Sequence, residues 1–128
     1  MRSAYLLIAH GSREKESNQA FEEFTSHLKS RFPGRYVQPA YLELAQPSIP
    51  ATIGSCIEQG AEEIFVIPMM LFPGRHVKED IPRYIQEAKE KHRHIDLHYA
   101  GPLSDHPLML ELVDEKAKSL LLGRSKTP

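Results

Sequence analysis

Tyr5-Leu6-Leu7-Ile8-Ala9-His10-Gly11-Ser12-Arg13 is the stretch of sequence that decides the fold of this chain. It begins with an apolar run rich in branched residues, and a run of this kind that is stopped by glycine is typical of a buried strand. A second stretch has the same form, because the apolar residues 64–72 are followed by Pro73-Gly74-Arg75-His76. We therefore expect two buried strands, each with a histidine just beyond its carboxyl end.

Strand and helix patterns alternate along the rest of the chain. Strands are predicted over 5–9, over 36–42, from residue 64 and over 95–100; helices are predicted over 14–32, 48–59 and 78–91 and from residue 105 onward. This alternation predicts an α/β, chelatase-like fold of the flavodoxin type: a parallel four-stranded sheet in the order 2-1-3-4 with helices on both faces. Pro39 cannot donate a ladder hydrogen bond, so we place the second strand at an edge of the sheet.

Particular residues mark the predicted helix ends. Ser48 is expected to cap the second helix, with Pro50 in its first turn. Asp105 is expected to cap the last helix, with Pro107 in its first turn. One face of that helix carries apolar residues, namely Leu108, Leu112, Val113, Ala117 and Leu120. We predict one domain over residues 1–123, followed by a polar tail at 124–128.

Composition excludes several classes of protein. The chain has 128 residues, of which 41% are hydrophobic and 26% charged, as in an ordinary globular domain. Its net charge of −1 provides no overall field to attract nucleic acid. The single cysteine, Cys56, excludes an internal disulfide framework. No apolar stretch approaches the roughly 20 residues of a membrane span, and the amino terminus lacks a signal-peptide pattern. We expect a cytoplasmic protein with no membrane or nucleic-acid partner.

The predicted strand order brings two histidines together. Strands 1 and 3 are neighbours, and ligands bind where the strand order reverses, at the carboxyl ends of the strands. His10 and His76 should therefore line one crevice, and strand 2 should deliver Glu43 to the same edge. Two imidazoles and a carboxylate suit a divalent ion such as Co²⁺, Ni²⁺, Fe²⁺ or Zn²⁺, and they also suit proton transfer. A lone histidine at a strand end is more often a partner of backbone groups, but two together favour a functional site.

The loop before His76 has the composition of a binding surface. Gly74 allows a ligand to approach the backbone closely, and Arg75 is a natural partner for carboxylates or phosphates. Leu71 and Phe72 lie beyond the strand and are expected to form an apolar wall for a flat ligand.

Three segments resemble those of the CbiX-type sirohydrochlorin chelatases: residues 9–13, residues 42–48 and residues 71–82. The resemblance covers nearly the whole chain and implies the small, single-domain form, which works as a homodimer. It implies insertion of Co²⁺ first of all, or of Ni²⁺ or Fe²⁺, into the anionic tetrapyrrole sirohydrochlorin, without an organic cofactor. It assigns His10 and His76 to the metal, and His10 also to proton acceptance.

The resemblance also assigns the positions that contact the substrate. They are Gln46, Leu71, Phe72, Pro73, Gly74, Arg75 and His76. Many relatives have an acid where this chain has Gln46, so a charge-based role there is not expected. We add Glu43 to His10 and His76 as a catalytic residue, for proton relay or help in holding the ion.

Two other functions are compatible with the same residues. A metal carrier or tetrapyrrole-holding protein would use the same crevice without turnover. A phosphoryl-transfer enzyme of the histidine-phosphatase type would also place histidine beside glycine and arginine. However, its motif runs Arg-His-Gly, whereas residues 10–13 read His-Gly-Ser-Arg.

Overall fold

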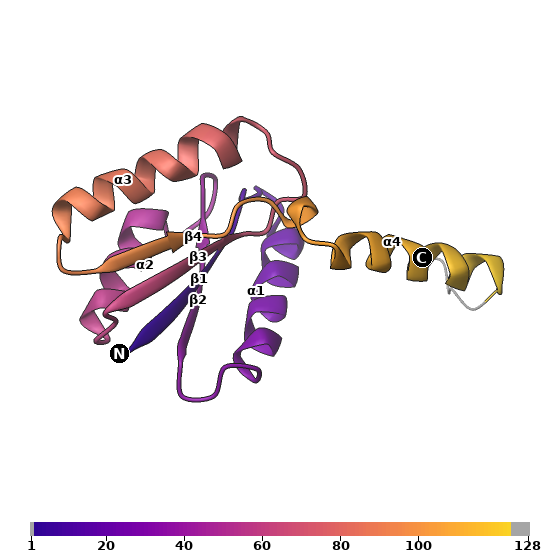
Figure 1. Cartoon of the computed structure of the whole chain (residues 1–128), viewed down its shortest axis with the longest axis horizontal. Helices are drawn as coiled ribbons and strands as arrows, with labels where there is room; N and C mark the ends of the chain where they lie inside the picture. Colours follow the sequence, from indigo (N-terminus) through magenta and orange to yellow (C-terminus); the bar gives the residue numbers. More distant parts are fainter. Residues whose placement is uncertain (1, 124–128) are drawn as a thin grey trace.

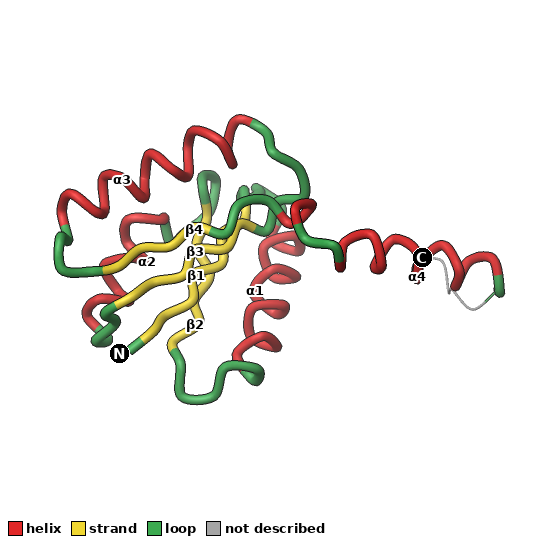
Figure 2. The backbone as a smooth tube through the Cα atoms, viewed as in Figure 1, coloured by secondary structure: helices red, strands yellow, loops and turns green. Residues whose placement is uncertain are grey.

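The computed structural model describes residues 2–123, so the predicted tail at 124–128 lies outside the described residues. Four parallel strands, β1 (Ser3–Ala9), β2 (Tyr36–Tyr41), β3 (Glu63–Pro68) and β4 (Asp96–Tyr99), form one sheet in the order β2-β1-β3-β4. The predicted order 2-1-3-4 is confirmed, and so is the edge position of the strand that contains Pro39. Figure 2 shows the twisted sheet between layers of helices.

Helices cover the two faces of the sheet unequally. α2 (Ile49–Glu58) and α3 (Ile81–Lys91) lie together on one face, whereas α1 (Lys15–Lys29) lies on the other (Figure 1). α4 (Leu108–Leu121) projects away from the body of the molecule. Helices on both faces are thus confirmed, but only three of the four described α-helices cover the sheet.

The main core lies between the sheet and the pair α2 and α3. Alternate residues of the central strands point into it and are fully buried, among them Leu6 and Ile8 of β1 and Val66 of β3. Ile53 of α2 and Ile81 of α3 meet them from the helix side. Since each buried aliphatic side chain contributes roughly 1.5–3 kcal/mol, this core fixes the order of the strands and the level at which they end.

The helix ends agree with the predictions at α2 and differ at α3 and α4. The Ala51 N–H donates to the Ser48 hydroxyl at 3.2 Å, so the predicted cap of α2 is present. Helical structure before α3 begins at His76, in a π-helical turn His76–Asp80, and not at residue 78. Asp105 does not cap the last helix, because it lies in a 3₁₀ turn, Leu103–Asp105, and Pro107 occupies the N-cap position.

None of the helices among residues 2–123 is both long and apolar enough to cross a membrane.

Candidate metal-delivery site at the carboxyl edge of the sheet

Backbone pairing beyond β1 and β2 places Glu43 beside His10. The Leu42 N–H donates to the Ala9 carbonyl at 2.9 Å, and the Glu43 N–H donates to the His10 carbonyl at 3.0 Å. The two chains therefore stay side by side past the last residue of each strand. As a result, His10 Nε2 lies 3.3 Å from Glu43 Oε2, with both side chains about half exposed.

Gly11 permits this close approach. Its φ is +98°, a conformation that side chains disfavour, and a Cβ at this position would lie 1.8 Å from the Glu43 carbonyl oxygen. Only glycine fits here without displacing the segment that carries Glu43.

His76 reaches the same site from the turn that precedes α3. The rings of His10 and His76 lie with their centroids 4.9 Å apart, tilted by 57°. Two imidazoles that share a tetrahedral ion, with each nitrogen roughly 2.0–2.1 Å from the metal, have centroids roughly 5 Å apart. The spacing of the two rings therefore suits a shared divalent ion.

Asp80 orients His76, and the sequence analysis missed this residue. His76 Nδ1 lies 2.6 Å from Asp80 Oδ2, one helical turn farther along the chain. This hydrogen bond, reinforced by the nearby Arg83 and Arg75, holds the pKa of the Asp80 carboxyl below its usual range. A carboxylate on Nδ1–H leaves the Nε2 lone pair of His76 free for a metal. The spacing of four residues between a histidine and an acid was the available signal.

The pair His10 and Glu43 has a different chemistry. His10 Nδ1 lies 3.1 Å from the Gly11 carbonyl oxygen, which accepts only from an N–H. In that tautomer Nε2 presents a lone pair to the Glu43 carboxylate. Two acceptors at 3.3 Å need a shared proton or a cation between them, so this pair is built to take up one or the other.

The site is open and not a closed metal cage. Within residues 2–123, no group of three or more His, Cys, Asp or Glu side chains is arranged to hold a metal ion. Two imidazoles with further coordination positions left free are typical of sites where an ion meets a substrate. The arrangement can therefore hold an ion weakly and pass it on.

The predicted substrate positions lie in the loops that follow β2 and β3, at the same edge of the sheet as the histidines. Leu71 and Phe72 are 48% and 71% exposed, so they form a solvent-exposed apolar surface a few residues before His76. Arg75 is exposed and forms an ion pair with Glu79 at 3.8 Å. Gln46 is exposed in the loop that follows β2. The fold thus places His10 beside both Glu43 and His76 and leaves the other predicted positions in the surrounding loops.

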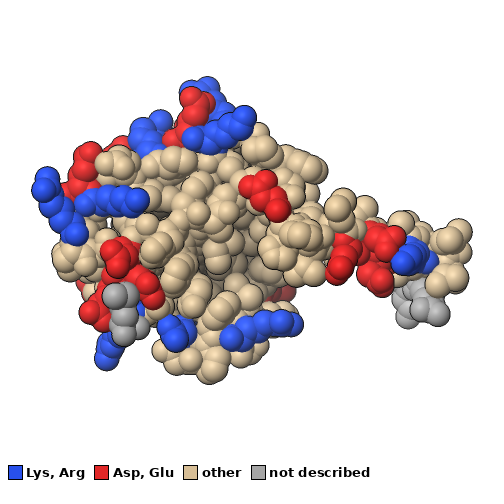
Figure 3. Space-filling model, in the orientation of Figure 1, with Lys and Arg blue, Asp and Glu red and all other residues tan. Residues whose placement is uncertain are grey.

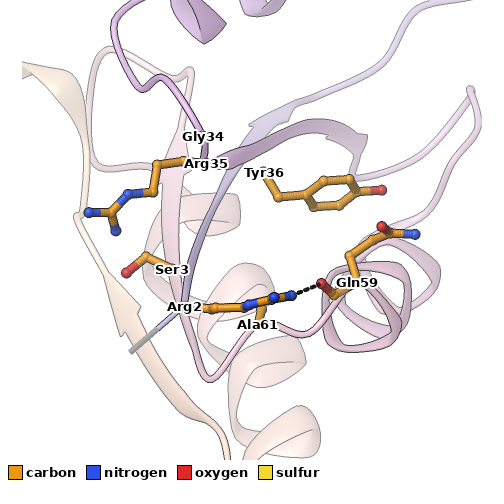
Figure 4. Close-up of a pocket in the computed structure, with 7 residues that line it drawn as sticks. All are labelled: Arg2, Ser3, Gly34, Arg35, Tyr36, Gln59 and Ala61. Atoms are coloured by element: carbon orange, nitrogen blue, oxygen red, sulfur yellow. Dashed lines mark hydrogen bonds between the residues drawn. The ribbon is translucent and has the colours of Figure 1, made fainter.

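A cavity of about 480 Å³ lies at the opposite edge of the sheet, at the amino ends of β1 and β2 (Figure 4). Its lining residues are Arg2, Ser3, Gly34, Arg35, Tyr36, Gln59 and Ala61. The Arg2 guanidinium donates to the Gln59 carbonyl at 3.4 Å, and Arg35 points away from that contact. Since ligands of open parallel sheets bind at the carboxyl ends of the strands, we place the functional site at the histidines and not in this cavity.

Removal of the Asp80 carboxylate should weaken metal binding at the histidines. We expect Asp80→Ala to raise the dissociation constant of Co²⁺ about 10- to 100-fold, because His76 loses its orienting partner. Titration calorimetry with Co²⁺ measures this change. Glu79→Gln is the matched control, because Glu79 is an exposed carboxylate one residue away. Equal effects of the two changes would show that Asp80 does not position His76.

The sequence and the fold of the chain match one family of known proteins. The CbiX family profile matches residues 4–120. The chain is 38% identical over 116 residues to the chloroplastic sirohydrochlorin ferrochelatase of Arabidopsis thaliana, covering 91% of this chain and 52% of that protein. It is also 38% identical over 109 residues to the sirohydrochlorin cobaltochelatase of Priestia megaterium, covering 84% of this chain and 35% of that protein.

A solved structure matches as well. The sirohydrochlorin chelatase SirB from Bacillus subtilis subspecies spizizenii, in complex with cobalt, superposes with a TM-score of 0.84 at 30% identity. The match covers 93% of this chain and 51% of the SirB chain. The chain therefore spans about half the length, or less, of these relatives.

Proposed function

The chain belongs to the CbiX family, and from this premise we propose that it is a metallochelatase that inserts a divalent ion into sirohydrochlorin. The observation that carries the proposal is the pair of facing imidazoles, His10 and His76, at the carboxyl edge of the sheet. Names of chelatases among its relatives and a cobalt-bound SirB structure support the same activity.

The reaction exchanges one dication for two protons. Two pyrrole N–H bonds of the macrocycle break, the ion exchanges its bonds to the histidines and water for bonds to the four ring nitrogens, and the two protons pass to His10 with Glu43 and to solvent. Both imidazole ligands are neutral, so they hold the ion without the strong attachment that thiolates would give. His10 and Glu43 accept one of these protons between them, because the Nε2 lone pair of His10 faces the Glu43 carboxylate at 3.3 Å.

The rim of the site suits a flat, anionic ring. Sirohydrochlorin is apolar across its face and carries carboxylates at its periphery. Leu71 and Phe72 offer an exposed apolar surface to the ring, and Arg75 offers a guanidinium to a carboxylate. We assign Gln46 and residues 71–76 to contacts with this substrate.

We propose that Co²⁺ is the preferred metal substrate and that Ni²⁺ and Fe²⁺ are alternative substrates. Imidazole ligands accept all three, and metal supply commonly decides among them. The relatives are named as both cobalto- and ferrochelatases, so the family membership alone selects neither ion.

We also propose a homodimer as the working unit. The cytoplasmic location stays a prediction.

A spectroscopic insertion assay tests the proposed function. Purified protein is mixed with sirohydrochlorin and with Co²⁺, Ni²⁺ or Fe²⁺ in parallel, and the absorption change of the metallated ring is followed. We expect many turnovers per chain with Co²⁺. Stoichiometric binding of ion or ring without turnover would contradict catalysis and favour a carrier.

A further inference from the structure

α4 exposes an apolar face to water. Its 14 residues project from the body of the molecule, and the large aliphatic side chains along it are 50–84% exposed. The side that we call the α4 stripe consists of Leu108, Leu112, Val113, Ala117 and Leu120. Most charged residues of the helix lie on the other side, at Glu111, Asp114, Glu115 and Lys118, whereas Lys116 lies between Leu112 and Leu120, where its aliphatic stem can cover apolar surface while its charged end stays in water. Figure 3 shows acidic and basic side chains on the projecting helix. An amphipathic helix of this kind gains its stability when its apolar side is buried.

The sheet has an uncovered face of its own. Tyr5, Phe65 and His98 are register partners on β1, β3 and β4, and we call them the aromatic row. Their rings stack at 5.3 Å between Tyr5 and Phe65 and at 5.0 Å between Phe65 and His98. The row lies opposite the main core, on the side of α1, because Tyr5 also stacks on Phe32 just past that helix. Tyr5 and Phe65 are only partly buried, and His98 is exposed, with its Nε2 3.8 Å from Glu63 Oε2 at the edge of the row.

The start of α4 is fixed at the edge that holds the metal-delivery site. The Leu103 and Ser104 N–H groups donate to the Met70 and Leu71 carbonyls at 3.0 and 2.8 Å. These bonds anchor the 3₁₀ turn from which α4 leaves the body (Figure 2). The superposition on SirB covers 93% of the chain, which is more than the 107 residues before α4 can supply, so the match extends into this helix.

We propose that α4 of each copy packs its stripe across the aromatic row of a second copy, in a reciprocal exchange. This rests on the homodimer of the proposed function and assigns its contact surfaces. One chain carries the exposed α4 stripe and an aromatic row that no helix among its residues 2–123 covers at Phe65 and His98, and the two do not meet within the chain. A two-fold axis lets each cover the other in the second copy.

The size of the contact is sufficient for a stable dimer. The stripe has four large aliphatic side chains, and each buries roughly 80 Å² of apolar surface. The aromatic row buries a matching area, and the two-fold axis doubles the contact. The total buried area is then roughly 1,300 Å², which lies within the range of about 1,200–2,000 Å² for specific interfaces.

A charge placed on the stripe tests the exchange. Light scattering on the apo-protein should give twice the 14.6 kDa of one chain. We expect Leu112→Glu to raise the dimer dissociation constant about 100-fold or more, because it places a charge in a buried contact. Leu122→Glu is the matched control: Leu122 follows Glu111, Glu115 and Lys118 at helical spacing on the polar side, and the dimer should persist. A monomeric wild-type chain, or a Leu112→Glu variant that dimerises normally, overturns the proposal.

Cross-linking identifies the partner surface even if Leu112→Glu does not fold. A tagged His98→Cys chain and an untagged Ala117→Cys chain are mixed and treated with a short bismaleimide. Cys56 is buried, and burial raises the pKa of its thiol to about 12, so it stays unreactive. We expect a cross-linked pair of one tagged and one untagged chain. A chain that carries both His98→Cys and Ala117→Cys is treated in the same way. If it forms links only within single chains, α4 folds back onto its own sheet and the exchange is wrong. Neither readout needs metal or tetrapyrrole, so failure here is distinct from failure of the insertion assay.

Discussion

A variant that lacks both imidazoles, His10→Ala with His76→Ala, should lose metal insertion, with the rate falling to that of the spontaneous reaction. We expect a decrease of at least about 10³-fold, because the change removes the ligands of the ion and the proton acceptor together. The fold should persist, since the two side chains are 46% and 40% exposed and contribute little to the core.

Initial rates of sirohydrochlorin metallation, with circular dichroism to check folding, measure this effect. His94→Ala is a suitable control, because His94 is exposed near the start of β4, at the opposite edge of the sheet. It should insert metal at the wild-type rate. Metallation by the double variant clearly above the rate without protein would show that the chemistry occurs elsewhere.

Gly11→Ala should lower the rate of insertion by displacing the segment that carries Glu43. The new Cβ would meet the Glu43 carbonyl oxygen at 1.8 Å, at a residue whose φ of +98° already disfavours a side chain. The clash must push the segment at Glu43 away from His10 and break the backbone hydrogen bond between them. We expect a loss of about 2 kcal/mol or more in stability, together with a lower rate of insertion.

Gly34→Ala separates the clash from the backbone strain. Gly34 has a φ of +77°, but a Cβ there would meet nothing within 4 Å. Thermal unfolding should show a decrease of Tm by roughly 5 °C or more for Gly11→Ala, and a smaller decrease with unchanged insertion for Gly34→Ala. If both variants insert metal normally, the contact between Gly11 and Glu43 does not position the site.

The alternation of apolar runs and amphipathic stretches was enough to predict the sheet and the meeting of His10 with His76. Periodicity reports which residues are buried, and parallel topology then determines which loops share an edge. Glu43 followed from the same reasoning. These predictions succeeded because they depend on the order of elements and not on side-chain detail.

Asp80 and the position of α4 could not be predicted in this way. The contact of Asp80 with His76 depends on helical structure beginning at His76, and we expected that helix only from residue 78. The apolar side of the last helix was predicted, but a periodic pattern does not say which surface will cover it. Asp105 has a side chain suited to capping, yet the 3₁₀ turn that binds Met70 and Leu71 holds it before the helix begins.

X-ray absorption spectroscopy of the bound Co²⁺ tests most directly whether the two histidines hold the ion. The multiple scattering of imidazole rings counts the histidine ligands around the cobalt. We predict two imidazoles in the wild-type chain and one in each of His10→Ala and His76→Ala. An imidazole count that is unchanged in both single variants would contradict a metal-delivery site at His10 and His76.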